Sequence, residues 1–209
     1  MMTQRVRIKF CGMAREEDLA YAAALGVDAI GLIFSPLSRR CVSIEQAKKL
    51  LRVLPPFVDV IAVLVNPDYA KVKEIISQLA IRTLQFHGDE TEEFCLQFDR
   101  PYIKALQIQS TAAFEEFSAK YPQASAFLLD TPSSTNRGGT GESFDWGIIP
   151  SNRSKPVILA GGLHAQNVKL AVEQCSPYAV DICSGIEVSP GIKDHKKMRQ
   201  FISALRGMT

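Results

Sequence analysis

Two residues with acid–base capacity stand at the ends of short apolar runs in this 209-residue chain. Cys11 ends the first run and is followed by Gly12, which leaves the thiol accessible. Asp130 ends the run Phe127-Leu128-Leu129. An ionised thiol can remove a proton and a carboxylic acid can deliver one, so the pair predicts general base and general acid catalysis. The structural alternatives are a buried small hydrophobic residue for Cys11 and a helix cap or turn residue for Asp130.

Small residues follow two other apolar runs. These residues are Gly161-Gly162 and Ser184-Gly185. Glycine lets backbone N–H groups approach a ligand closely, and the positive end of a following helix favours an anion. Two such strand ends side by side predict a phosphate cradle, which in a β/α barrel lies after the seventh and eighth strands.

Three other features have both structural and functional interpretations. Arg40, next to Arg39, is either a solvated surface residue or a clamp for a carboxylate. His87 precedes Gly88 and is interpreted first as a turn former. The loop 131–143, rich in Gly, Ser and Thr, is either a flexible connection or a functional lid.

Strand parity predicts one ion pair. Lys9 lies two residues before Cys11, and Asp181 lies two residues before Cys183, so each pair of residues faces the same side of its strand. If these sides face the barrel interior, a lone lysine there would be costly. Because the first and last strands are neighbours in a closed barrel, Lys9 and Asp181 are predicted to pair.

Eight strand–helix units must position these groups. The expected strands are Val6–Cys11, Ala29–Ser35, Val58–Val65, Thr83–His87, Tyr102–Gln107, Ala126–Asp130, Pro156–Ala160 and Ala179–Cys183, with helical patterns between them and a short turn opening at Asp145. Runs that are apolar on both faces indicate buried parallel strands. Eight repeats favour a single (β/α)8 barrel domain over residues 1–209, and a doubly wound open sheet is the alternative.

The composition indicates a soluble globular protein. The chain is 46% hydrophobic and 22% charged, and its net charge of +2 gives no reason to expect nucleic acid or a membrane surface as a partner. Five scattered cysteines without a C-x-x-C pair predict a reducing cytoplasm and no metal site. Nothing marks an interface, so a monomer is the default expectation.

An ordered set of motifs from the first strand to the last helix resembles the phosphoribosylanthranilate isomerase family of tryptophan biosynthesis. The motifs are Lys9-Phe10-Cys11-Gly12, Phe34-Ser35-Pro36 with Ser38-Arg39-Arg40, Leu84-Gln85-Phe86-His87-Gly88, Leu129-Asp130-Thr131, Gly138-Gly139-Thr140-Gly141, Leu159-Ala160-Gly161-Gly162-Leu163, and Val180-Asp181 with Ser184-Gly185-Ile186-Glu187 and Pro190-Gly191-Ile192-Lys193-Asp194. No single motif is decisive, but the ordered set is highly specific.

The resemblance implies a cofactor-free Amadori rearrangement, in which an aminoaldose phosphate becomes an aminoketose phosphate. By this resemblance Cys11 is the general base and Asp130 the general acid, and Arg40 binds the anthranilate carboxylate. The phosphate is expected at Gly161, Gly162, Ser184 and Gly185. The expected substrate-binding residues also include His87, Gly139 and Asp181.

The chain departs from the family pattern at three positions. Leu37 and Cys41 stand where a lysine and an aromatic residue are common, and Cys183 replaces a frequent serine. Two other functions stay open. One is a Schiff-base aldolase that uses Lys9 or Lys104, and the other is a phosphate-binding barrel that has lost its activity.

Overall fold

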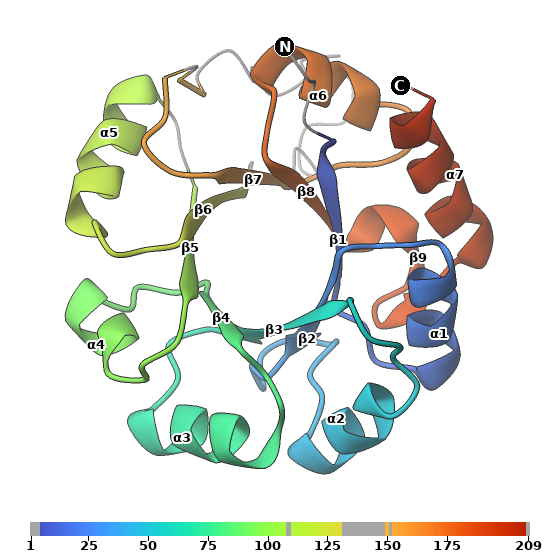
Figure 1. Ribbon diagram of the computed structural model, residues 1–209, viewed down its shortest axis with the longest axis horizontal. Helices are drawn as coiled ribbons and strands as arrows, with labels where there is room; N and C mark the ends of the chain where they lie inside the picture. Colours follow the sequence, from blue (N-terminus) through green and yellow to red (C-terminus); the bar gives the residue numbers. More distant parts are fainter. Residues whose placement is uncertain (1–4, 108–109, 131–148, 151, 208–209) are drawn as a thin grey trace.

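Eight parallel strands close into a barrel in which each strand pairs with its neighbours in chain order and β8 pairs with β1 (Figure 1). The computed structural model describes residues 5–107, 110–130, 149–150 and 152–207. The strands are β1 (Arg7–Cys11), β2 (Ala29–Ile33), β3 (Asp59–Leu64), β4 (Thr83–Phe86), β5 (Tyr102–Leu106), β6 (Ala126–Asp130), β7 (Val157–Ala160) and β8 (Ala179–Ile182). The predicted barrel is confirmed, and the open-sheet alternative is wrong.

Helices surround the barrel in a ring (Figure 1). They are α1 (Glu16–Ala24), α2 (Ile44–Leu51), α3 (Tyr69–Gln78), α4 (Glu92–Leu96), α5 (Thr111–Lys120), α6 (Val168–Cys175) and α7 (His195–Arg206). Side-chain caps explain where five of them begin: Ser43, Asp68, Thr91, Ser110 and Asp194 each accept a hydrogen bond from a backbone N–H of the first turn.

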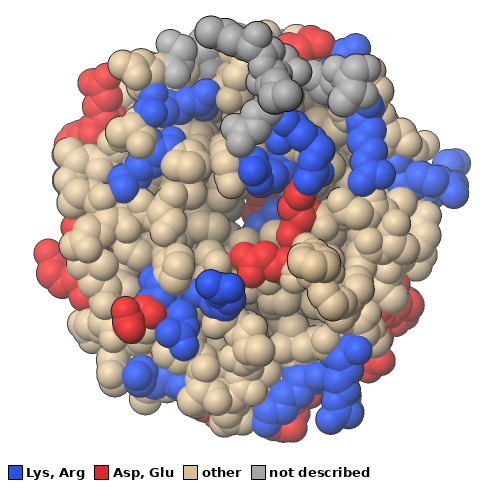
Figure 2. Space-filling view, viewed as in Figure 1, with Lys and Arg blue, Asp and Glu red and all other residues tan. Residues whose placement is uncertain are grey.

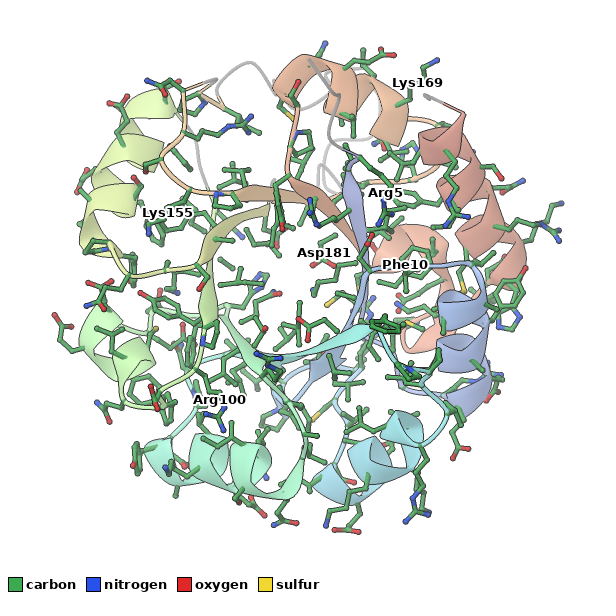
Figure 3. The ribbon with its side chains drawn as sticks, viewed as in Figure 1. Arg5, Phe10, Arg100, Lys155, Lys169 and Asp181 are labelled. Atoms are coloured by element: carbon green, nitrogen blue, oxygen red, sulfur yellow. The ribbon has the colours of Figure 1, made fainter. Side chains whose placement is uncertain are left out.

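The strand period of two divides the core into an inner and an outer part. Outward-facing residues pack under the helices. Phe10 of β1, labelled in Figure 3, meets Phe201 of α7 edge-on, with 6.2 Å between the ring centroids. The inner apolar cluster contains only eight buried residues, namely Ile61, Ile103, Ala105, Ala126, Leu128, Ile158, Ala160 and Ala179. Polar side chains such as Lys9, Gln85 and Asp181 are buried as well.

A small hairpin follows β8 that the sequence patterns did not predict. The 3₁₀ helix η2 (Ser184–Ile186) leads into β9 (Glu187–Ser189), which pairs antiparallel with β10 (Ile192–Lys193). Gly191, at φ +86°, makes the turn between them, a backbone angle that L-residues rarely adopt. The hairpin carries two charged residues into the site described below.

Some predicted features lie outside the described residues: the loop 131–143, Gly139 and the turn at Asp145. That the whole chain forms one domain stays a prediction. Among the described helices, none combines the length and the apolar character needed to cross a bilayer. Within the same residues, no group of three or more His, Cys, Asp or Glu side chains is arranged to hold a metal ion. The face seen in Figure 2 is hollowed near its centre, with basic and acidic side chains both close by.

Candidate active site

A cavity of about 500 Å³ lies at the carboxyl ends of the strands. It brings together residues from opposite ends of the sequence. Its lining includes nine of the ten predicted site residues, namely Cys11, Arg40, His87, Asp130, Gly161, Gly162, Asp181, Ser184 and Gly185. The tenth, Gly139, lies outside the described residues. The position of the cavity follows from the parallel barrel, which collects all eight carboxyl ends on one face.

Lys9 and Asp181 form the predicted buried ion pair beneath this cavity. The Lys9 Nζ lies 2.8 Å from Asp181 Oδ2, and the two side chains are 3% and 7% exposed. Burial works against the charged form of Lys9, but Asp181 and the nearby Cys11 more than compensate, so the pKa of Lys9 is raised above its usual value. Lys9 therefore stays a cation, and its amine is a poor nucleophile for a Schiff base.

Cys11 is buried at the end of β1, close to Lys9. Gly31 of β2 provides the room, because a Cβ there would lie 2.8 Å from Cys11 Sγ and 3.1 Å from Lys9 Nζ. The pKa of the Cys11 thiol is raised well above its usual value, first by a hydrogen bond with Cys183 and then by burial. Without a ligand, Cys11 is therefore a thiol, whereas the role expected of it requires the thiolate.

Asp130, at the end of β6, contacts His87 in the cavity lining. The His87 Nε2 lies 3.2 Å from Asp130 Oδ2, and Gln85 Nε2 lies 3.0 Å from His87 Nδ1. Because the Gln85 amide donates to Nδ1, Nε2 carries the ring proton and donates to the Asp130 carboxylate. His87 thus orients Asp130, which goes beyond the turn-forming role expected for it.

A buried network fixes the loop that carries His87. The Lys104 Nζ lies 3.0 Å from Glu90 Oε2 and also donates to the carbonyl oxygen of Gly88. Glu90 in turn accepts hydrogen bonds from the backbone N–H groups of Gly88 and Asn66. Lys104 is 1% exposed and does not line the cavity, so this arrangement supports a structural role and not that of an aldolase lysine.

Arg40 is clamped by a residue that the sequence analysis did not single out. Its Nε and one terminal nitrogen lie 2.8 Å and 2.6 Å from the two carboxylate oxygens of Glu187, at the start of the hairpin. This bidentate bond is the chief reason that the pKa of Arg40 is raised. The guanidinium is thereby held at the cavity wall.

Lys193 is the second charged residue that the hairpin supplies. Its fully buried Nζ donates to the carbonyl oxygen of Cys11 at 2.6 Å and to Glu187 Oε1 at 2.9 Å, and it lies 3.8 Å from the sulfur of Cys183. Glu187 and Lys193 both belong to quoted motifs. An acidic and a basic residue on either side of Pro190-Gly191 could have indicated an ion pair between Glu187 and Lys193.

The residues predicted to hold a phosphate lie on the loops after β7 and β8, and both loops line the cavity. Gly161 and Gly162 have φ values of +77° and +62°, and a Cβ on Gly162 would meet only open space. A Cβ on Gly185 would lie 2.0 Å from the carbonyl oxygen of Leu163, so glycine is required where the two loops meet. The η2 helix begins directly at Ser184, and α6 begins at Val168.

Comparisons with known proteins agree with the family suggested by the motifs. Residues 8–204 match the family model described as N-(5'phosphoribosyl)anthranilate (PRA) isomerase. A Legionella pneumophila (strain Paris) protein named N-(5'-phosphoribosyl)anthranilate isomerase is 55% identical over 207 residues, which cover 99% of this chain and 100% of the relative.

Solved structures point the same way. The Thermotoga maritima phosphoribosyl anthranilate isomerase superposes with a TM-score of 0.88 at 35% identity, covering 97% of this chain and 99% of that one. A second structure of such an isomerase, in complex with reduced 1-(o-carboxyphenylamino)-1-deoxyribulose 5-phosphate, has a TM-score of 0.86 at 34% identity over the same shares. The chain therefore belongs to the phosphoribosylanthranilate isomerase family.

Proposed function

We propose that this cavity carries out the isomerisation of N-(5'-phosphoribosyl)anthranilate to 1-(2-carboxyphenylamino)-1-deoxyribulose 5-phosphate, the tryptophan-biosynthesis reaction of the family, with Cys11 as general base and Asp130 as general acid. The observation that carries the assignment is their placement on β1 and β6, at one rim of the same cavity, with the glycine loops of β7 and β8 between them along the barrel. A phosphate held at those loops presents a ribose to both groups.

The acid step falls to Asp130. Protonation of the furanose ring oxygen by Asp130 opens the ring to a Schiff base. His87 holds the carboxyl group in position through its 3.2 Å contact.

The base step falls to Cys11. Its thiolate removes the proton from C2 of the opened sugar, which gives an enolamine that tautomerises to the ketone. Lys9, close by and held as a cation by Asp181, supports the negative charge on the sulfur. No step calls for a cofactor or a metal ion.

The substrate is bound at both ends of the cavity. Gly161, Gly162, Ser184 and Gly185 offer backbone N–H groups and a hydroxyl to the phosphate. Arg40, whose Nε and one terminal nitrogen bind Glu187, offers its further N–H groups to the anthranilate carboxylate.

Further substrate contacts are proposed for Asp181, which lines the cavity, and for Gly139.

Two substitutions test the catalytic assignments. Cys11→Ala and Asp130→Asn should each lower kcat at least about a hundredfold with KM little changed. The assay follows the loss of phosphoribosylanthranilate fluorescence, with the labile substrate made in situ. A rate close to that of the wild type in either variant would remove the role assigned to that residue.

Two broader expectations also stay proposals. All five cysteines are free thiols, which supports a reducing compartment such as the cytoplasm. A monomeric state is checked by analytical ultracentrifugation across a range of protein concentrations.

A further inference from the structure

Two cysteines face each other where the barrel closes. In the parallel pairing of β1 with β8, Lys9 lies opposite Asp181 and Phe10 opposite Ile182, so the next position brings Cys11 beside Cys183. Both cysteines line the cavity. Gly12 leaves room for the Cys183 side chain, because a Cβ there would lie 2.9 Å from Cys183 Sγ.

The charges around the two sulfurs differ. Cys183 has two cations close by, namely Lys193, with Nζ 3.8 Å from the sulfur, and Arg40, whose stem passes over Gly12. Glu187 binds both cations and partly offsets their charge. Cys11 has Lys9 beside its thiol, and that ammonium is already bonded to a carboxylate, whereas Lys193 contacts Cys11 at the backbone carbonyl oxygen.

These surroundings decide which sulfur is ionised near neutral pH. A hydrogen bond from Cys11, followed by the charges of Lys193 and Arg40, lowers the pKa of Cys183 to about 7, although burial and Glu187 act in the other direction. The same hydrogen bond, burial and the charge of Asp181 raise the pKa of Cys11, and Lys9 only partly opposes them. The proton of the pair therefore lies on Cys11 and the charge on Cys183.

We propose that Cys183 holds the negative charge of this thiol pair in the substrate-free protein and accepts the Cys11 proton when substrate binds, which makes Cys11 the thiolate base. One S–H bond breaks at Cys11 and one forms at Cys183, the charge moves in the opposite direction, and no oxidant or reductant takes part. Cys183 acts through Cys11 and is a positioning residue for its proton. The inference rests on the proposed role of Cys11 as the base.

Substrate binding supplies the reason for the transfer. A carboxylate that binds Arg40 takes up part of the positive charge that stabilises the Cys183 thiolate. A phosphate at Ser184, the next residue, adds negative charge beside it. Lys9 is bound to Asp181 and stays beside Cys11, so the balance moves toward the Cys11 thiolate.

The first test locates the thiolate without substrate. Absorbance near 240 nm, followed against pH, should show one thiolate with a midpoint near pH 7 in the wild type. Cys183→Ser should abolish this transition, whereas Cys11→Ser, which keeps a hydroxyl donor, should retain it. The opposite pattern, with the transition lost in Cys11→Ser and kept in Cys183→Ser, would overturn the proposal.

The second test uses the pH profile of kcat/KM. Without an acceptor at position 183, the Cys11 proton must leave to solvent, so Cys183→Ser should lower kcat/KM at pH 7 at least about tenfold and move the acidic limb up by about one pH unit or more. Cys41→Ser, at an exposed thiol outside the cavity, is the matched control and should leave the profile unchanged.

The outcomes separate this inference from the proposed function. An unchanged profile in Cys183→Ser, with Cys11→Ala inactive, would refute the proton transfer and keep Cys11 as the base. An active Cys11→Ala variant would refute both. A fall in kcat/KM that is the same at every pH would assign Cys183 a packing role and would also overturn the inference.

Discussion

Replacing Lys9 with methionine would test the buried ion pair beneath the cavity. Methionine keeps most of the apolar stem and removes the ammonium. Both side chains of the pair are almost fully buried, and the second oxygen of Asp181 has no hydrogen-bond partner among the described residues. The variant therefore leaves a buried carboxylate with no cation, and the expected loss is about 3–5 kcal/mol. Against a typical stability of about 5–15 kcal/mol, that is a large fraction.

The pH dependence gives the prediction a second readout. The pKa of Lys9 is raised in the folded protein, so its contribution is complete below the ordinary lysine value and is lost only as the pH rises through the higher folded value. In the wild type this contribution is flat between pH 5 and 8.

Urea denaturation of three variants measures these effects. Lys9→Met should show the full loss at pH 7, and the double variant Lys9→Met with Asp181→Asn should recover most of it, because no buried charge is left. Asp181→Asn alone leaves the Lys9 ammonium without its carboxylate and serves as the matched single variant. A loss below about 1 kcal/mol in Lys9→Met would refute the view that this buried pair is tightly coupled.

The remaining predictions concern substrate binding. Gly185→Ala places a Cβ against the carbonyl oxygen of Leu163, so it should separate the loops after β7 and β8 and raise KM at least about tenfold. The Cβ of Gly162→Ala meets open space, so this variant should cost only the strain of a positive φ, about 1–2 kcal/mol of stability. Equal KM values for the two variants would contradict the packing argument. Arg40→Lys loses the planar fork that spans both oxygens of Glu187 and should raise KM more than it lowers kcat, as steady-state kinetics would show.

Features set by local periodicity were predictable from the sequence. The alternation of side chains along a strand placed Lys9 with Cys11 and Asp181 with Cys183 on the inner face, and barrel closure then required the Lys9–Asp181 pair. Glycines at strand ends marked the loops of the cradle. These inferences need only the two-residue period and the order of the strands.

Features that depend on the short hairpin after β8 were not predictable. The hairpin strands have three and two residues, too few for a pattern, and Glu187 reaches Arg40 across 147 residues of chain. The charge state of Cys11 depends on Cys183 and, through it, on Lys193 of that hairpin. Residue type alone pointed to Cys11 as the ionised sulfur, whereas its burial and its partner make it the protonated one.

The seam between β1 and β8 has a consequence for the order in which the site comes into being. Lys9 and Cys11 are synthesised well before Asp181, Cys183 and Lys193, because 172 positions separate Lys9 from Asp181. Until the eighth strand docks, the nascent chain has no partner for its first buried cation and no acceptor beside its reactive thiol. We expect an interrupted translation product that lacks this strand to be inert, because the site is complete only when β1 and β8 meet.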